Sequence, residues 1–311
     1  MSSLASEPSG VNSVAIVILT WNQCHATVRC LSSLIAAGYA PDRIVLWDNG
    51  STDGTAAKVR SAFPQVICHL HDRNLGVASG RNAGARLAEQ TLNPAFLLFL
   101  DNDMVVTPGF LEYLLEPFEH IDRLAQTEPK IRFIDDATRL NAAGGCRIQF
   151  CLGKIEPVGY GETDTGQYDE QVRCIPNGGA MLVRMEIFNL LGGFDSVFDP
   201  YGPEDLDFSL RVRRMGYHGM YIPKAVVHHE RGRTVEGGEF NEIYARNKTR
   251  HWMILMRRHA SPLQRLGFYI WGAPIGFLRI LIRETLSGNT EALKGLLGGF
   301  LGTVFRRRPG S

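Results

Sequence analysis

The first hundred residues alternate fully apolar runs with amphipathic segments, at the lengths of short strands and helices. Runs such as Val14–Leu19 and Ala95–Leu100 are almost entirely apolar, which is typical of strands buried on both faces. Segments such as Thr27–Ala37 place apolar residues three or four positions apart, which predicts helices. The alternation predicts an α/β layer with a mostly parallel sheet. The predicted strands cover 14–19, 43–47, 66–70 and 95–100, and the predicted helices between them cover 27–37, 53–63 and 79–90.

The second half of the chain is less regular. Residues 135–175 are rich in Gly, Asp and Thr, which predicts loops and an irregular hairpin. A strand and a helix return over 178–191, followed by a helix over 205–215 and a strand over 219–228. From about residue 239 the pattern is helical. We therefore predict a loose leader over 1–12, an α/β domain over 13–238, and an amphipathic helical region over 239–311.

Composition and charge narrow the classes of function. Hydrophobic residues make up 44% and charged residues 21% of 311 residues, which is ordinary for a globular protein. A formal net charge of +1 argues against a nucleic-acid partner. The charge is uneven, because Arg231–Ser311 carries a net +9 and the preceding chain a net −8. The basic, apolar tail indicates either contact with an anionic surface or a solvated face of a helical subdomain.

The cysteines and the N-terminus indicate a cytoplasmic protein. No two of the six cysteines have the two-residue gap of a zinc or redox motif, so we expect free thiols in a reducing compartment. Glu7 and the lack of a basic run before Val14 argue against a signal peptide.

Polar residues follow each of the four predicted strands. Ligands of such sheets bind beyond the carboxyl ends of the strands, so we expect these residues to gather at one edge. Asp101 and Asp103, one residue apart after the most apolar strand, suit a hard divalent cation, Mg²⁺ or Mn²⁺. The polar residues are Thr20 and Asn22, Asp48 and Asp53, Asn74 and Gly76, and Asp101, Asn102 and Asp103.

A series of short segments resembles a known family. The segments are Val17–Asn22, Asp48–Gly54, Asn74–Gly76 with Gly80–Asn82, Asp101–Asp103, Asn177–Val183, Gly192–Asp195, Pro203–Asp207, His228–Thr234 and Arg246–Asn247. In this order they resemble family 2 inverting glycosyltransferases, in particular bacterial rhamnosyltransferase-like members, over about residues 14–250. The resemblance implies a glycosyltransferase A fold (Rossmann-like, with a mostly parallel sheet) for residues 13–238 and a C-terminal helical extension. It also implies a nucleotide-sugar donor and inversion at the anomeric carbon.

The resemblance implies a divalent cation that offsets the charge of the departing diphosphate. Asp103 is its first expected ligand, with Asp101 beside it and a late histidine completing the site. His229 fits the family's spacing, with His228 as the alternative, because strand alternation turns only one of them inward.

The resemblance also implies the donor site. We expect a UDP- or dTDP-sugar there. Arg81 either reaches a phosphate or forms a structural salt bridge, and the loop with Arg231 and Arg233 either closes over the diphosphate or stays solvated. The full set of expected donor-binding residues is Thr20, Asn22, Asp48, Asp53, Asn74, Gly76, Arg81, Asp101, Asn102, Gly179, Arg231 and Arg233.

Direct displacement with inversion requires a base for the acceptor hydroxyl. The resemblance assigns this role to Asp205, with Glu204 as a contact to the acceptor or an orienting group. The alternative for both is capping of the helix that they begin.

The C-terminal region carries two apolar segments, Leu266–Leu278 and Leu296–Phe305, each shorter than the ~20 residues of a bilayer-spanning helix. We expect them to lie on a membrane surface at the cytoplasmic face, which would suit a lipid-linked acceptor. Packing on the catalytic domain or in a homodimer is the alternative.

The sequence thus predicts a metal-dependent inverting glycosyltransferase that acts on a hydroxyl of a glycan or lipid-linked acceptor. Two alternatives stand beside it. One is a nucleotidyltransferase acting on sugar phosphates, although residues 20–30 lack the expected Gly-rich basic loop. The other is a non-catalytic module that binds nucleotide sugars.

Overall fold

The strands were located in a computed structural model, which describes residues 10–230 and 242–286 together with 288, 294, 295 and 298. The four strands predicted in the first hundred residues are present, each displaced by at most one residue at either end. In chain order the strands are β1 (Val14–Thr20), β2 (Ile44–Asp48), β3 (Ile67–Leu70), β4 (Phe96–Asp101), β5 (Met104–Val106), β6 (Leu124–Phe133), β7 (Leu140–Ala142), β8 (Cys146–Gln149), β9 (Lys154–Pro157), β10 (Val172–Cys174), β11 (Ala180–Arg184) and β12 (His218–His229).

The helices also follow the predicted pattern in the first hundred residues and again after residue 184. A π-helical turn, Phe268–Gly272, joins the last two into one continuous helix. In chain order the helices are α1 (Cys24–Ala36), α2 (Thr55–Ala62), α3 (Val77–Leu92), α4 (Phe110–Leu115), α5 (Met185–Leu190), α6 (Glu204–Arg214), α7 (Glu242–His259), α8 (Pro262–Gly267) and α9 (Ala273–Leu286).

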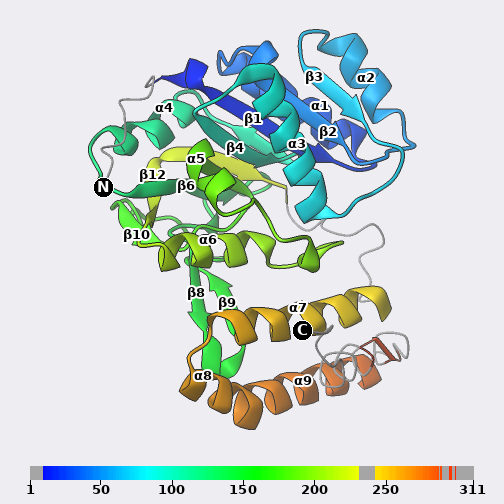
Figure 1. Cartoon of the computed structure of the whole chain (residues 1–311), viewed down its shortest axis with the longest axis vertical. Coiled ribbons are helices and arrows are strands. Elements are labelled where there is room, and N and C mark those ends of the chain that lie inside the picture. The colour runs from blue at the N-terminus through cyan, green and yellow to red at the C-terminus, as the bar shows by residue number, and fades with distance from the viewer. Residues whose placement is uncertain (1–9, 231–241, 287, 289–293, 296–297, 299–311) are drawn as a thin grey trace.

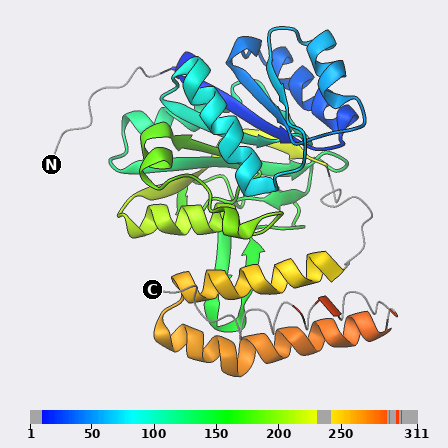
Figure 2. The same ribbon diagram turned by 45° about the vertical axis from the view of Figure 1, so that its right-hand side comes forward.

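The molecule has an upper part built on the sheet and a lower part built from α7, α8 and α9 (Figures 1 and 2). Helices cover both faces of the sheet, and α6 and the β8–β9 hairpin lie between the two parts. The predicted boundary at residue 238 and most of the predicted leader lie outside the described residues, so those bounds stay predictions.

The main sheet is mixed, which departs from the mostly parallel sheet expected. Its order is β10-β12-β6-β11-β4-β1-β2-β3, and the β3-β2-β1-β4 half is parallel as predicted. Beyond it, β11 runs antiparallel to both β4 and β6, and β10 runs antiparallel to β12. The 10-residue strand β6 was not predicted, because buried polar residues such as Gln126 and Glu128 interrupt its apolar pattern.

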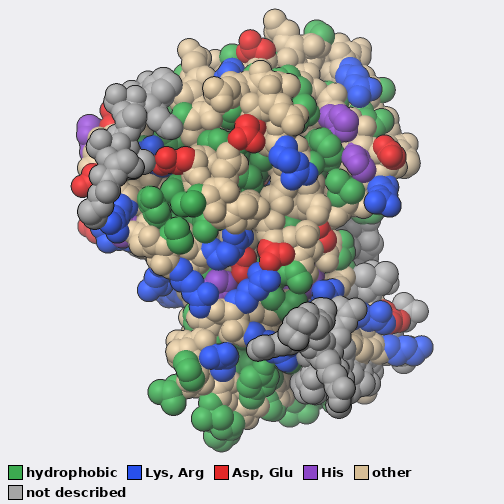
Figure 3. Space-filling view, viewed as in Figure 1, with side chains coloured by type: hydrophobic (Ala, Val, Ile, Leu, Met, Phe, Trp, Pro, Cys, Tyr) green, Lys and Arg blue, Asp and Glu red, His purple; other side chains and the backbone are tan. Residues whose placement is uncertain are grey.

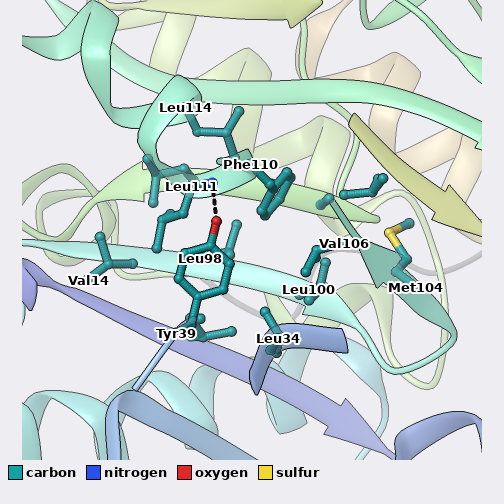
Figure 4. Close-up of a cluster of buried hydrophobic side chains, with 14 of the residues drawn as sticks. Val14, Leu34, Tyr39, Leu98, Leu100, Met104, Val106, Phe110, Leu111 and Leu114 are labelled. Carbon is teal, nitrogen blue, oxygen red and sulfur yellow. Dashed lines mark hydrogen bonds between the residues drawn. The ribbon is translucent and has the colours of Figure 1, made fainter. Parts of the chain in front are cut away.

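The core lies on both faces of the sheet. Leu98 and Leu100 of β4 point into one buried cluster, whereas Leu97 and Phe99 point into the other, as strand alternation requires. Figure 4 shows the first cluster, in which the Tyr39 hydroxyl accepts a hydrogen bond from the backbone N–H of Leu111 at 2.8 Å. Burial on both faces explains why this strand is apolar throughout.

Residues 135–175 form loops, short strands and the β8–β9 hairpin, as predicted. The C-terminal helix is longer than predicted. Pro262–Leu286 is a 25-residue helix that contains an 18-residue stretch with a mean hydropathy of 1.3, of which 11% is buried. By length and composition alone the helix is long and apolar enough to cross a membrane. The helix extends beyond the predicted apolar segment Leu266–Leu278 at both ends, and Arg279 does not interrupt it. The second segment, Leu296–Phe305, lies almost entirely outside the described residues.

Candidate active site

The carboxyl ends of the parallel strands lie side by side at one edge of the sheet. Thr20 pairs with Asp48, Asp48 with Leu70, and Leu19 with Asp101 in the strand register. The loops that follow these strands therefore meet at this edge, as predicted.

The loops after β1 and β2 are tied together by Asn22 and Asp53. Asn22 adopts a φ of 52°, and its side-chain oxygen accepts a hydrogen bond from the backbone of Thr52 at 2.8 Å. Asp53 accepts hydrogen bonds from the backbones of Cys24 and Thr55, both at 3.0 Å. These contacts shape the rim of the edge, and contact of either residue with a donor stays a prediction.

Thr20, Asn102 and Asp48 line the buried floor of this edge. The Asn102 side-chain amide donates to Thr20 Oγ1 at 3.1 Å and to Thr27 Oγ1 at 3.0 Å, so Asn102 fastens β4 to β1 and α1. One carboxylate oxygen of Asp48 accepts from the backbone of Ser51 at 2.8 Å. The other is buried and has no hydrogen-bond partner among the described residues. A buried acceptor left open in this way is suited to a ligand N–H or O–H.

Asn74 and Gly76 shape the turn that leads into α3. Asn74 Oδ1 accepts from the Asn49 side chain and from the backbone of Gly76, both at 2.8 Å. Gly76 has a φ of +92°, and a Cβ there would lie 2.4 Å from a carboxylate oxygen of Asp199. Asp199, which the sequence did not point to, caps α3, because its carboxylate accepts a hydrogen bond from the backbone N–H of Ala78 at 2.9 Å.

Arg81 connects three segments of the site. Its guanidinium donates to Asp101 Oδ1 at 2.6 Å, to Glu204 Oε1 at 3.0 Å and to the carbonyl of Gly178 at 3.1 Å. The Arg81 side chain is only 9% exposed. Of the two roles considered for Arg81, the geometry favours the structural salt bridge, because the guanidinium is already occupied.

The pKa of Glu204 is shifted by its burial beside Arg81 and Asp205. Burial, followed by the charge of Asp205, raises the pKa of Glu204 to about 8, although Arg81 acts in the opposite direction. Its Oε2 atom is buried without a hydrogen-bond partner among the described residues. An oxygen of Glu204 therefore remains available inside the site.

Asp103 and His229 lie together at the ends of β4 and β12. The His229 Nε2 atom is 3.3 Å from Asp103 Oδ1. Burial disfavours the charged ring, but Asp103 outweighs it and raises the pKa of His229. His228 is half-buried, and burial and Arg132 lower its pKa. His229, and not His228, is therefore the histidine beside Asp103.

The carboxylates and histidine do not form a complete metal cage. Among the residues that the structure describes, no group of three or more His, Cys, Asp or Glu is arranged to hold a metal. Asp101 is turned toward Arg81 through Oδ1, so the three expected ligands are not gathered around one point. Asp103 Oδ1 is paired with His229 Nε2 at 3.3 Å, whereas His229 Nδ1 is buried without a hydrogen-bond partner in the described part of the chain. A carboxylate and an imidazole nitrogen that face each other fit a cation that would replace their direct contact, with substrate phosphate and water completing its coordination.

Asp205 lies at the start of α6, across Gly178 from Arg81. Its carboxylate accepts from the backbone of Gly178 at 2.5 Å and from that of Leu206 at 2.7 Å. A Cβ on Gly178 would lie 2.7 Å from the Asp205 Cβ, and one on Gly179 would lie 2.6 Å from the end of Met104. Glycine at both positions therefore lets the chain pass closely beside Asp205 and Met104.

Glu128, which the sequence did not point to, supports the segment that holds Asp205. Its Oε2 atom accepts from the backbone of Asn177 at 3.0 Å, and Oε1 lies 3.5 Å from the Cys174 thiol. Glu128 is 1% exposed, and burial raises its pKa to about 8. No sequence pattern separates such a buried acid in a strand from one that faces solvent.

The structure thus gathers Asp101, Asp103, Glu204, Asp205 and His229 at one edge, around Arg81 and the 177–179 segment. The predicted donor contacts of Arg231 and Arg233 lie outside the described residues.

Comparison with known sequences gives one family. The model of Glycosyl transferase family 2 matches residues 15–188. The chain is 26% identical to the N-acetylglucosaminyl-diphospho-decaprenol L-rhamnosyltransferase of Mycobacterium tuberculosis, over 88% of this chain and 89% of that protein. It is 37% identical to the validoxylamine A glucosyltransferase of Streptomyces hygroscopicus subsp. limoneus, over 34% of this chain and 24% of that protein.

Two solved structures share the fold. A mannosyltransferase from Pyrobaculum calidifontis in complex with GDP-Man and Mn²⁺ aligns with a TM-score of 0.55 and 15% identity, over 94% of this chain and 87% of that one. GalNAc-T7 with UDP, GalNAc and Mn²⁺ aligns with a TM-score of 0.57 and 21% identity, over 70% of this chain. The chain spans 43% of the length of GalNAc-T7. At these identities the likeness shows the fold.

Proposed function

Because this chain belongs to glycosyl transferase family 2 and has the glycosyltransferase A fold, we propose that it transfers a sugar from a nucleotide-sugar donor to a hydroxyl, with inversion. It is a glycosyltransferase, which replaces the nucleotidyltransferase and binding-module alternatives. The observation that carries the proposal is the Arg81 guanidinium, which joins Asp101 on the donor side to Glu204 on the acceptor side. Arg81 would thereby hold the residues that bind the donor and the residues that bind the acceptor in a fixed relative position.

The donor nucleotide would lie over the ends of β1 and β2. The open, buried oxygen of Asp48 is suited to the imide N–H of uracil or thymine, which supports a UDP- or dTDP-sugar. Thr20 and Asn102 would close the floor beneath the base. Asn22, Asp53, Asn74 and Gly76 would shape the rim.

A divalent cation, Mn²⁺ or Mg²⁺, would be held by Asp103 and His229 next to the donor diphosphate. When bound, it would offset the negative charge that gathers on the departing diphosphate. The Asp103 carboxylate and His229 Nε2 face each other at 3.3 Å, so a cation between them would replace this direct contact. The Mn²⁺ in the two fold neighbours agrees with this choice.

Asp205 would remove the proton of the acceptor hydroxyl. Its carboxylate is anchored by two backbone N–H groups, which keep it at the start of α6. The free Oε2 of Glu204 would accept a hydrogen bond from the acceptor or the sugar. The deprotonated acceptor oxygen would form its bond to the anomeric carbon on the side opposite the sugar–phosphate bond, which breaks as the nucleoside diphosphate leaves, so a single displacement inverts that carbon.

The acceptor would be a glycan or a lipid-linked glycan at the cytoplasmic face of a membrane. The name of the M. tuberculosis relative includes a diphospho-decaprenol acceptor. The basic, apolar C-terminal helices would provide the membrane contact. A homodimer through the same helices is the alternative that sedimentation would reveal.

The test is a single-turnover assay with UDP- and dTDP-sugars, Mn²⁺ and a lipid-linked acceptor. Asp205→Asn is expected to lose transfer by ~10²-fold or more, the contribution typical of a general base, while it still binds donor. Asp42→Asn, at an exposed position before β2, is the matched control and keeps full activity. Near-normal transfer by Asp205→Asn would remove this residue from the mechanism.

The cation is tested by binding as well as by activity. Titration calorimetry with MnCl₂ and UDP should show binding that Asp103→Ala abolishes. Full transfer by wild-type protein in EDTA would exclude the cation.

A further inference from the structure

The helix Pro262–Leu286 exposes apolar side chains along its whole length. Leu263 is 81% exposed and Trp271 64%, values unusual for apolar residues on the surface of a soluble protein. At 1.5 Å per residue the helix is roughly 37 Å long. Figure 3 shows apolar side chains gathered at the lower end of the molecule, where α8 and α9 lie. The exposed apolar residues, which we call the apolar stripe, are Leu263, Leu266, Ile270, Trp271, Ile275, Leu278, Ile282 and Leu286.

The opposite side of the same helix is fixed to the body of the protein. A Cβ on Gly272 would lie 2.5 Å from the carbonyl oxygen of Cys151, at the tip of the β8–β9 hairpin. A Cβ on Gly267 would lie 3.3 Å from Cys151 Sγ. Phe268, between these glycines, is buried in a cluster with Leu255 of α7. The helix is therefore seated on the hairpin and on α7 by one face, while the apolar stripe faces outward.

Positive charge borders the apolar stripe. Residues 242–286 contain eight Lys and Arg against two Glu. Arg279 is exposed within the helix itself. Lys and Arg side chains also lie in a band between the apolar end and the upper part of the molecule (Figure 3). An apolar surface with basic neighbours is complementary to a bilayer that contains anionic lipid.

We infer that the apolar stripe docks in the plane of an anionic lipid bilayer, with the helix lying along the surface and not crossing it. Crossing would place Arg279 and Arg283 among lipid chains, which is costly. It would also pull Gly272 away from the hairpin tip and expose Phe268. Docking in the plane keeps both contacts and lets the arginines reach the headgroups.

This orientation narrows the acceptor, and that part of the inference rests on the proposed function. The β8–β9 hairpin begins beside the site, where the Asn177 side chain donates to Cys146 Sγ at 3.5 Å, and it ends on the helix. Each of its strands has four residues, so the hairpin holds the site roughly 13 Å above the docked helix. A short glycan on a membrane lipid would reach Asp205 at that height, whereas a long polysaccharide would need no such spacing.

The docking is tested without donor or acceptor, on the full chain. The protein is sedimented with vesicles of phosphatidylcholine alone and with vesicles of equal parts phosphatidylcholine and phosphatidylglycerol. We expect binding to the anionic vesicles and release by high salt at alkaline pH. Binding that only detergent releases would show a crossing helix and overturn the inference.

Variants test whether the apolar stripe is the surface that contacts the vesicles. The double change Ile270→Glu with Leu278→Glu is expected to weaken vesicle binding at least tenfold without lowering the melting temperature, since both side chains are exposed. Leu190→Glu, at a 60% exposed position in the upper part, is the matched control and should bind normally. Arg279→Gln should weaken binding to anionic vesicles about fivefold, from ~1 kcal/mol per basic residue. Equal binding by the double variant and the control would overturn the inference.

Two further measurements separate the other outcomes. Light scattering in solution would show a dimer through the apolar stripe, and a dimer that binds no vesicles would overturn membrane docking. Transfer to a water-soluble acceptor by the double variant should stay normal, while transfer to a vesicle-borne acceptor falls. Failure of both transfers in every variant and in wild type would count against the proposed function and not against docking.

Discussion

Replacement of Arg81 tests the centre of the site most directly. Arg81→Gln removes the positive charge shared by Asp101 and Glu204 and takes a donor from the Gly178 carbonyl. The Glu204 side chain is only 5% exposed, so water does not replace the lost partner. The variant keeps a side chain of similar reach but leaves the buried Glu204 carboxyl group without its cationic partner, whereas Asp101, at 36% exposed, stays partly hydrated.

The size of the effect follows from burial. Removing one partner of a buried ion pair lowers the free energy of unfolding by ~3–5 kcal/mol. In a chain of this size that corresponds to a fall in melting temperature of roughly 6–20 °C. The control is Arg29→Gln, since Arg29 also pairs with a carboxylate, that of Glu230, but is 42% exposed. An exposed pair contributes ~0–1 kcal/mol.

The assay is urea unfolding of both variants in EDTA, so that no cation takes the place of the guanidinium. The loss in free energy of unfolding that Arg81→Gln causes relative to wild type should grow from pH 6 to pH 9. Arg81 lowers the pKa of Glu204, so the loss of Arg81 raises that pKa further above 8. The folded variant then keeps Glu204 protonated at a pH at which the unfolded chain is deprotonated, so its stability falls as pH rises. A deficit below ~1 kcal/mol at pH 9, or one equal to that of Arg29→Gln, would refute the reasoning.

Two other predictions concern Glu128 and the helix glycines. The pKa of Glu128 is raised to about 8, so the folded state keeps a proton that the unfolded chain releases, and wild-type stability falls as pH rises from about 4.5 to 8. The free energy of unfolding of Glu128→Gln should therefore rise relative to that of wild type by up to ~3–5 kcal/mol between pH 5 and pH 8. A difference between the two proteins that stays constant with pH in urea titrations would contradict this. Gly272→Ala should lower stability by ~1–3 kcal/mol, because its methyl meets the Cys151 carbonyl at 2.5 Å. Gly276→Ala, which meets nothing within 4 Å, should raise stability by up to ~1 kcal/mol, and the same sign for both in thermal melts would disprove the seating of the helix on the hairpin.

The predictable part of the fold is the part in which burial and backbone geometry act on the same residues. β1 and β4 are covered on both faces, so their sequences are almost entirely apolar and can be recognised as buried strands from the sequence. β6 is equally buried, but Gln126, Thr127 and Glu128 occupy three successive positions in it. The Gln126 amide donates to the Ser209 hydroxyl at 3.1 Å, and the Thr127 hydroxyl donates to the Leu114 carbonyl at 2.9 Å. These partners lie on other elements, so no local pattern indicates the strand.

The C-terminal helix shows a similar limit. Counting apolar residues up to Arg279 predicts a short segment, because a charged residue ends an apolar run. The helix continues regardless, since its backbone hydrogen bonds are local and an exposed Arg279 does not interrupt them. Its seating on Cys151 depends on a contact more than a hundred residues away in sequence, which helical periodicity does not contain.

The sequence by itself predicted that the polar residues after the four parallel strands gather at one edge, because parallel strands end at a common edge, and the strand register confirms that edge. Glu204, Asp205 and His229 follow none of these strands, and only the family resemblance pointed to them. Only the tertiary structure decided how the groups are divided among roles. Arg81 meets Asp101 at a separation of 20 residues and Glu204 at a separation of 123. A charge so deeply buried takes whichever carboxylates the folded chain places within hydrogen-bond distance, and that distance is set by packing and not by the order of residues.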